Sequence, residues 1–182
     1  IKFLDYRINS KKEQNMRILL IGALLFLTSA CSGINPGSSN SMSVDERLAQ
    51  LFMIEVRPTY GPKHIANVEK SIRDHQVGGV VFFKGNPTEQ VKLTNRFQAL
   101  SKTKMLVAID GEWGLAMRLS NTISYPYQLG LGSIADNKII YEMGREIGRQ
   151  CKRMGIHVNF APVIDVNNNP NNPVINYRSF GE

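Results

Sequence analysis

The chain has 182 residues, of which 42% are hydrophobic and 20% are charged. This composition is that of an ordinary globular protein, and it excludes a disordered, collagenous or disulfide-rich chain. The 22 basic and 15 acidic residues give a net charge of +7. No basic stripe or stacking-aromatic motif accompanies that excess, so we expect no nucleic-acid partner.

The N-terminal residues predict segments that lie outside the folded domain. Residues 1–15 precede the first methionine and show no apolar period, so we interpret them as a non-native upstream segment. Residues 16–30 have the parts of a secretory signal peptide, namely a cationic start, a short apolar run and small residues at a cleavage point. The apolar run, residues 18–27, is shorter than the about 20 residues that a membrane-spanning helix needs.

The position of Cys31 suggests a lipid anchor. Because this cysteine directly follows Ser29-Ala30, the segment resembles a bacterial lipoprotein signal, which implies cleavage before Cys31 and a lipid on its thiol. The alternative is a plain signal peptide with an incidental cysteine. We expect an exported protein, lipid-anchored through Cys31 to the bilayer of a bacterial envelope membrane, in the periplasm or at the cell surface. Residues 31–42, rich in Gly, Ser and Asn, predict a flexible tether.

Helices are predicted from Ser43 onward by cap residues and apolar spacing. Ser43 and Glu46 have the spacing of a capping box, which predicts a helix start at Ser43. The apolar residues expected on the inner faces of four successive helices are Leu48, Leu51 and Phe52; Ile65, Val68 and Ile72; Leu93, Phe97 and Leu100; and Ile139, Ile140, Met143, Ile147 and Cys151. Asn86-Pro87 and Asp136 predict the starts of the third and fourth helices.

Continuous apolar runs between these helices predict buried strands at residues 79–83, 105–109 and 158–164. Alternating helices and doubly buried strands indicate an α/β fold with a parallel sheet. No Gly-x-Gly-x-x-Gly follows a strand, which argues against dinucleotide binding. A complete (β/α)₈ barrel needs about 250 residues, so the pattern fits either a small open sheet or the first half of a barrel.

Polar residues gather where the predicted strands end. Lys84 follows the first strand, Asp110 and Glu112 follow the second, and Asp165 follows the third. Because active sites of parallel α/β folds lie at the carboxyl ends of the strands, this pattern indicates a site for a polar substrate. His64, His75 and His157 are too scattered to form a metal site, so we expect no metal.

Four motifs at these strand ends resemble the N-terminal barrel domain of glycoside hydrolase family 3. They are GGVVFF at 78–83, IDGEWGLAMR at 109–118, FAPVIDV at 160–166 and NYRSFGE at 176–182. The resemblance runs from about Ser43 to the end, and it implies that residues 43–182 are the N-terminal part of a (β/α)₈ TIM-type barrel. The family commonly has Glu-Gly-Gly where this chain has Glu112-Trp113-Gly114, a version similar to that of β-N-acetylglucosaminidase-like members.

The resemblance implies a retaining, exo-acting glycosidase that needs no cofactor. We expect a β-N-acetylglucosaminidase whose substrate is an oligosaccharide or amino-sugar glycoside derived from the cell wall. A β-glucosidase or β-xylosidase of the same family is the close alternative. A non-catalytic sugar-binding lipoprotein is a second class of function, and a structural envelope lipoprotein is a third.

The resemblance also assigns substrate-binding residues. It implies that Asp110 accepts hydrogen bonds from hydroxyls of the sugar that is cleaved off, and that Arg118 and Arg178 flank the same sugar. A carboxylate accepts from two hydroxyls, and a guanidinium fork donates to hydroxyl oxygens while staying charged. Glu112 either contacts the sugar or holds Arg118 in place, and we favour the second role. Trp113 either stacks on a sugar or fills the loop.

No catalytic residue is expected within residues 1–182. Retaining glycosidases hold two carboxyl groups about 5–5.5 Å apart, but Asp110 and Glu112 are two positions apart on an extended segment and point to opposite faces. The resemblance places the nucleophilic aspartate, the acid/base and a Lys-His sugar-binding motif beyond Glu182, and we interpret Asp165 as a residue that fixes its loop. We expect this chain alone to be inactive and poorly folded, because an unclosed barrel exposes strand edges.

Overall fold

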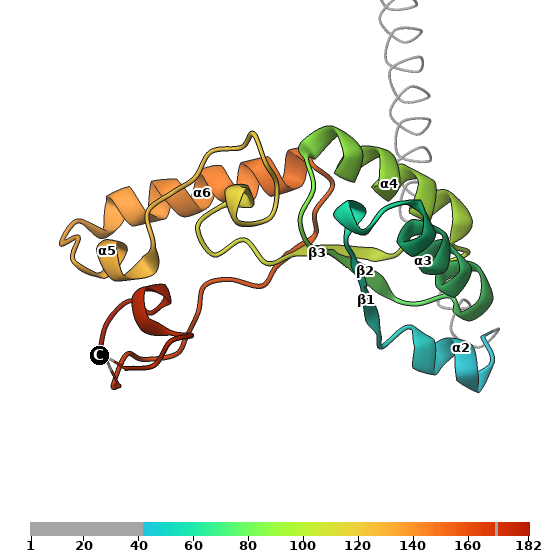
Figure 1. Ribbon diagram of the computed structural model, residues 1–182, viewed down its shortest axis with the longest axis horizontal. Coiled ribbons are helices and arrows are strands. Elements are labelled where there is room, and N and C mark those ends of the chain that lie inside the picture. Colours follow the sequence, from blue (N-terminus) through green and yellow to red (C-terminus); the bar gives the residue numbers. More distant parts are fainter. Residues whose placement is uncertain (1–41, 170) are drawn as a thin grey trace, which may run out of the picture. The chain divides into compact units, whose positions relative to one another are not determined.

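The computed structural model describes residues 42–169 and 171–182 (Figure 1). The predicted upstream segment at 1–15, the predicted signal peptide at 16–30 and the lipid attachment at Cys31 lie outside the described residues. So does the predicted tether at 31–42, except for its last residue. In the described part of the chain, no helix combines the length and the apolar character that a membrane span requires.

Within the described residues, four strands pair in parallel, in the order in which they follow along the chain. They are β1 (Met53–Val56), β2 (Gly79–Phe82), β3 (Leu106–Ile109) and β4 (Val158–Asn159). The register pairs Val56 with Phe82, Phe82 with Ile109 and Ile109 with Asn159. The four strands therefore end level with one another, and the residues that follow them start at one edge of the sheet. This sequential order lacks the reversal that marks a doubly wound sheet.

Helices connect the strands, as Figure 1 shows. The α-helices are α2 (Val44–Ala49) before β1, α3 (Pro62–His75), α4 (Pro87–Leu100), and α5 (Gln128–Gly132) with α6 (Asn137–Arg153) before β4. Short 3₁₀ helices are η3 (Pro58–Tyr60), η4 (Leu115–Met117) and η5 (Asn176–Arg178). α3 contacts both α4 and β1.

Cap residues begin the helices where the sequence predicts. Ser43 Oγ accepts from the Glu46 N–H at 3.1 Å, and Glu46 Oε2 accepts from the Ser43 N–H at 2.9 Å, which completes the capping box. Asn86 Oδ1 accepts from the Glu89 N–H at 3.0 Å at the start of α4. Asp136 caps α6 by accepting from Lys138 N–H at 2.9 Å. Each cap satisfies a backbone donor that a helix start leaves free.

The core lies between the sheet and the helices that connect its strands. Its buried members include Val56, Val80, Phe82, Val107 and Ile109 from the strands, Ile65, Val68 and Ile72 from α3, Leu93 and Phe97 from α4, and Ile147 and Cys151 from α6. Phe82 stacks on Phe97 with ring centroids 6.5 Å apart. Val107, Ala108 and Ile109 are all fully buried, which confirms that this strand is covered on both faces.

The first predicted helix is shorter than expected, and its predicted inner face is exposed. α2 ends at Ala49, and Leu48, Leu51 and Phe52 are more than half exposed. The apolar residues after Ala49 lead into β1, a strand that the apolar spacing does not predict. In α6, Ile139 is exposed as well, although it lies four positions before Met143, because it is in the first turn of the helix, beyond the buried part of that face.

The third predicted strand is also much shorter than expected. Only Val158 and Asn159 pair with β3, and the last hydrogen bond of this ladder runs from the Phe160 N–H to the Ile109 carbonyl at 2.9 Å. β3 ends at Ile109, so later residues have no partner strand on that side, and Pro162 has no N–H to donate. Residues 160–164 therefore leave the sheet, and Ile164 is 94% exposed.

Candidate sugar-binding site

Side chains from the ends of three strands meet at one edge of the sheet. Arg57 follows β1, Phe83 follows β2 and Asp110 follows β3. The guanidinium carbon of Arg57 lies 5.1 Å from the centroid of the Phe83 ring, and that of Arg118 lies 4.5 Å from the same centroid. Phe83 thus contacts two arginines through its ring, a geometry that favours both cations. Lys84, expected among the polar strand ends, is exposed and has a left-handed backbone conformation.

Asp110 and Arg118 form an ion pair at this edge. Arg118 Nη2 contacts Asp110 Oδ2, and Arg118 Nε donates to the backbone carbonyl of Asp110 at 3.1 Å. The side chain of Asp110 is 23% exposed and that of Arg118 is 16% exposed. The pair is therefore largely desolvated, but it keeps some surface for a ligand.

Glu112 and Arg178 form a second ion pair. Arg178 Nε donates to the two Glu112 carboxylate oxygens at 3.2 and 3.0 Å, and Arg178 Nη2 donates to Oε1 at 2.5 Å. These hydrogen bonds raise the pKa of Arg178 above its ordinary value, and the nearby Asp110 carboxylate adds to this effect. The expectation that Glu112 holds Arg118 is therefore wrong, because Arg118 pairs with Asp110 and Glu112 pairs with Arg178.

The three binding residues predicted from the sequence therefore lie together with Glu112. We define Asp110, Glu112, Arg118 and Arg178 as the charge cluster. Two acidic and two basic side chains balance each other there, so each charge has a partner. The arrangement offers carboxylate acceptors and guanidinium donors to one ligand. These are the groups that bind sugar hydroxyls.

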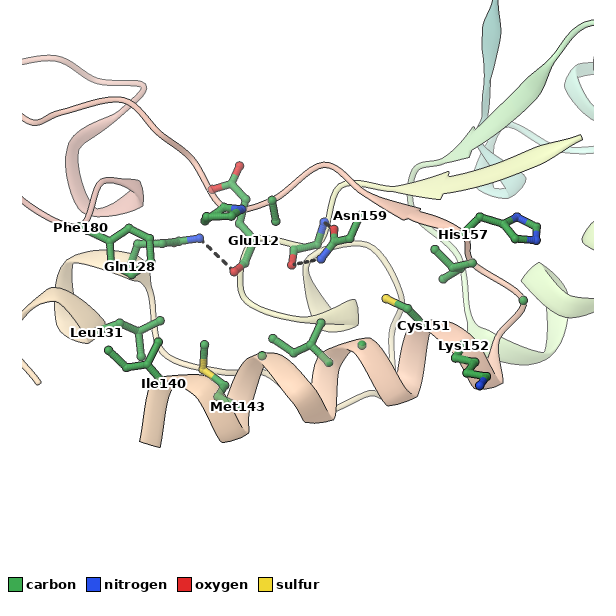
Figure 2. Close-up of a pocket in the computed structure, with 18 residues that line it drawn as sticks. Glu112, Gln128, Leu131, Ile140, Met143, Cys151, Lys152, His157, Asn159 and Phe180 are labelled. Carbon is green, nitrogen blue, oxygen red and sulfur yellow. Dashed lines mark hydrogen bonds between the residues drawn. The ribbon is translucent and has the colours of Figure 1, made fainter. Parts of the chain in front are cut away.

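The loop that carries this cluster is fixed by residues that the sequence analysis did not single out. Asn159, the last residue of β4, accepts from the Gly111 N–H at 2.9 Å through its side-chain oxygen. Gln128 Nε2, from the start of α5, donates to the Glu112 carbonyl at 2.9 Å (Figure 2). The Glu112 N–H lies 3.4 Å from the Met117 sulfur. Asn159 and Gln128 are identified only by contacts with residues 48 and 16 positions away, so no local sequence pattern marks them.

Aromatic side chains stand beside the charge cluster. Trp113 meets Tyr127 edge to face with centroids 4.7 Å apart, and Tyr127 lies 4.6 Å from Tyr177. Trp113 directly follows Glu112, and Tyr177 directly precedes Arg178. Tyr127 therefore packs between Trp113 and Tyr177, and Trp113 contributes to the packing of this loop.

Asp165 does not fix its loop through a buried contact, because its side chain is exposed. The loop is instead tied by the Asn167 N–H, which donates to the Gly181 carbonyl at 2.8 Å. Asp165 therefore lies outside the charge cluster, and its predicted role is not supported. Within the described residues, no three His, Cys, Asp or Glu side chains lie together as candidate metal ligands.

A cavity of about 750 Å³ lies beside α6 (Figure 2). Its apolar lining includes Leu131, Met143, Ile147, Ile156 and Pro162. Glu112 also lines it, but Asp110, Arg118 and Arg178 do not. This cavity therefore shares only Glu112 with the charge cluster.

Comparison with known proteins identifies relatives over this same region. The model of the Glycosyl hydrolase family 3 N terminal domain matches residues 43–182. Beta-hexosaminidase A of Pseudoalteromonas piscicida is 36% identical over 124 residues, which are 61% of this chain and 21% of that protein. Beta-hexosaminidase LpqI of Mycobacterium tuberculosis is 28% identical over 146 residues, which are 77% of this chain and 36% of that protein. The chain thus spans about a fifth to a third of the length of these curated relatives.

Solved structures confirm the fold. A glycoside hydrolase family 3 β-N-acetylglucosaminidase from Paenibacillus sp. str. FPU-7 superposes with a TM-score of 0.67 at 31% identity, covering 78% of this chain and 28% of that one. Beta-glucoside phosphorylase BglX bound to 2FGlc gives a TM-score of 0.71 at 23% identity, covering 80% and 26%, and shows the fold alone. The expected α/β fold, with the strand order of the N-terminal part of a (β/α)₈ barrel, is confirmed.

Proposed function

The chain belongs to glycosyl hydrolase family 3, and from this premise we propose that it forms part of the sugar-binding site of a retaining, exo-acting β-N-acetylglucosaminidase. The observation that carries the proposal is the charge cluster of Asp110, Glu112, Arg118 and Arg178 at the carboxyl edge of the sheet. That edge is where enzymes with barrel folds bind their substrates.

The cluster suits a sugar at the non-reducing end of a saccharide. Asp110 accepts hydrogen bonds from two neighbouring hydroxyls, and the guanidinium groups of Arg118 and Arg178 donate to hydroxyl oxygens. Because Arg118 and Arg178 neutralise the nearby carboxylates, the site stays close to neutral and binds an uncharged ring. Contacts that tighten as the ring distorts raise the rate as well as the affinity.

We assign neither Asp110 nor Glu112 as nucleophile or acid/base. Asp110 is held by Arg118, and Glu112 is held by Arg178 in a bidentate pair. A nucleophile must approach the anomeric carbon, with a second carboxyl group about 5–5.5 Å away. We therefore propose that the nucleophile and the acid/base are other residues of the full-length gene product.

Removal of N-acetylglucosamine is the reaction that the relatives favour. Two are named beta-hexosaminidases, and the Paenibacillus structure is a β-N-acetylglucosaminidase. A second candidate is a β-glucosidase, since a relative from Cellulomonas fimi at 24% identity is named "Beta-N-acetylglucosaminidase/beta-glucosidase". A substrate from wall-derived saccharides agrees with an exported enzyme.

We further propose that the protein is exported and lipid-anchored through Cys31. The support is the order of cationic start, short apolar run, small residues and cysteine in residues 16–31. Radioactive palmitate is expected to label the wild-type protein in growing bacteria and to leave Cys31→Ala unlabelled. Label persisting in Cys31→Ala would contradict the anchor.

The direct test of activity uses the full-length gene product and chromogenic β-glycosides. We expect hydrolysis of the N-acetyl-β-glucosaminide with a kcat/KM at least about tenfold above those for the β-glucoside and β-xyloside, because a preference of this size corresponds to only about 1.4 kcal/mol. Preference for the glucoside or xyloside would select the close alternative. Binding of N-acetylglucosamine without hydrolysis of any glycoside would show a non-catalytic sugar-binding lipoprotein.

A further inference from the structure

We propose that Glu112 is a positioning residue for sugar binding, which acts by holding the guanidinium of Arg178 and makes no contact with the sugar. This inference rests on the proposed function and deepens it. The side chain of Glu112 is only 1% exposed, whereas that of Arg178 is 27% exposed. A carboxylate with almost no exposed surface cannot receive a hydroxyl, so Glu112 reaches the ligand only through its partner.

The backbone around Glu112 is fixed from several sides. Its carbonyl accepts from Gln128, its N–H faces the Met117 sulfur, and the preceding Gly111 is held by Asn159. These contacts come from α5, η4 and β4, elements that belong to different parts of the chain. The Glu112 carboxylate is therefore a fixed anchor point.

Arg178 is the partner that this anchor orients. It lies in η5, 66 positions further along the chain, and its other contact is from Nη1 to the Val174 carbonyl at 3.2 Å. A guanidinium carries five N–H groups. Within the described residues, these hydrogen bonds use one hydrogen on each nitrogen, which leaves the second hydrogen of Nη1 and of Nη2 for a ligand. The bidentate pair fixes the plane in which those two hydrogens point.

The test is a double-mutant cycle in the full-length protein, with Glu112→Gln, Arg178→Ala and the double variant. Glutamine keeps the volume of Glu112 but loses the charge that holds the guanidinium. We expect Glu112→Gln to lower kcat/KM and to raise Kd for N-acetylglucosamine by about tenfold or more, because charge-assisted hydrogen bonds are roughly twice as strong as neutral ones. The matched control is Glu146→Gln, which breaks the exposed pair of Glu146 with Arg149 on α6 and is expected to leave both constants unchanged.

The cycle separates positioning from general structural support. If Glu112 acts only through Arg178, the double variant equals Arg178→Ala within about twofold, because the second change removes nothing further. The proposal would be overturned if the losses of kcat/KM in the two single variants multiply in the double variant. It would also be overturned if Glu112→Gln has the kcat/KM and Kd of the wild type. Should Glu112→Gln fail to fold by circular dichroism, Glu112→Asp keeps the charge but shortens the side chain, and it carries the same test in a cycle with Arg178→Ala.

Measuring both kcat/KM for hydrolysis and Kd for N-acetylglucosamine also separates this inference from the proposed function. A protein that hydrolyses no glycoside but shows the non-additive cycle in Kd would contradict the hydrolase and keep the positioning role. An active enzyme in which Glu112→Gln behaves as wild type would keep the hydrolase and reject the positioning role. A protein that neither binds nor hydrolyses any of these sugars would overturn both.

Discussion

The side chain of Asn159 holds both backbone groups of Gly111, 48 positions away in the chain. Its oxygen accepts from the Gly111 N–H at 2.9 Å, and its Nδ2 donates to the Gly111 carbonyl at 3.3 Å. A Cβ at Gly111 would lie 3.3 Å from the Asn159 oxygen and 3.1 Å from the Gly114 carbonyl. The end of β4 is thus joined to the loop after β3, which places Asp110 and Glu112 on either side of one fixed residue.

Loss of the Asn159 amide is expected to destabilise the protein. Asn159→Ala leaves the Gly111 N–H without its partner, which costs about 1–3 kcal/mol, whereas the Gly111 carbonyl still accepts from the Gly114 N–H at 3.1 Å. We expect a lower melting temperature and a smaller free energy of unfolding for this variant of the full-length protein. Asn95→Ala, at an exposed position of α4, is the matched control. Equal stability of the two variants would show that the Asn159 hydrogen bonds contribute nothing.

Arginine at position 118 is expected to be irreplaceable by lysine. Arg118 contacts the Asp110 carboxylate, donates to the Asp110 carbonyl through Nε and lies over the Phe83 ring. A lysine keeps the charge but lacks the planar guanidinium with its several N–H donors, so it cannot make the three contacts together. We expect Arg118→Lys to lower kcat/KM by about tenfold or more. Arg145→Lys, in an exposed pair with Glu142, is the control, and similar kcat/KM values for both variants would refute the role of the fork.

The Cys151 thiol is expected to be unreactive in the folded protein. Burial raises the pKa of this thiol above its ordinary value, so the neutral form is favoured. The stability that the neutral thiol provides is complete below the unfolded pKa of about 8.5 and is lost as the pH rises through the folded pKa.

Alkylation by iodoacetamide tests this expectation, with the Cys151 peptide followed by mass spectrometry. At pH 8 we expect the folded protein to react at least about tenfold more slowly than the protein in urea, because only the accessible thiolate is a nucleophile. The rate in the folded protein is expected to rise only at higher pH. Equal rates with and without urea would contradict the burial of Cys151.

Local signals predicted much of the fold. The starts of α2, α4 and α6 follow from caps at Ser43, Asn86 and Asp136, because a cap involves residues only two or three positions apart. The strand β1 was missed because its apolar residues continue the spacing of the preceding helix. The length of β4 depends on where its neighbour β3 ends, and that information lies outside its own sequence.

The sequence predicted which side chains of the candidate site lie together, but not their contacts, and their role in sugar binding stays a prediction. The motifs contain Asp110, Arg118 and Arg178, and the structure brings these residues together through the ion pairs of Asp110 with Arg118 and of Glu112 with Arg178. The partner of Glu112 could not be read from spacing, since Arg118 is six positions away and Arg178 is 66. Which arginine pairs with which carboxylate is decided by the path of the chain after β4.

Binding of N-acetylglucosamine to the full-length protein and to Asp110→Ala, measured by isothermal titration calorimetry, tests the sugar-binding site most directly. Asp110 is expected to accept two hydrogen bonds from the sugar, each contributing about 1.5–3 kcal/mol because the acceptor is charged. We expect the wild-type protein to bind and Asp110→Ala to show a Kd at least about a hundredfold higher. Asp74→Ala, which removes an exposed carboxylate on α3, is expected to bind as the wild type does. Wild-type affinity in Asp110→Ala would contradict the assignment of the charge cluster as the sugar site.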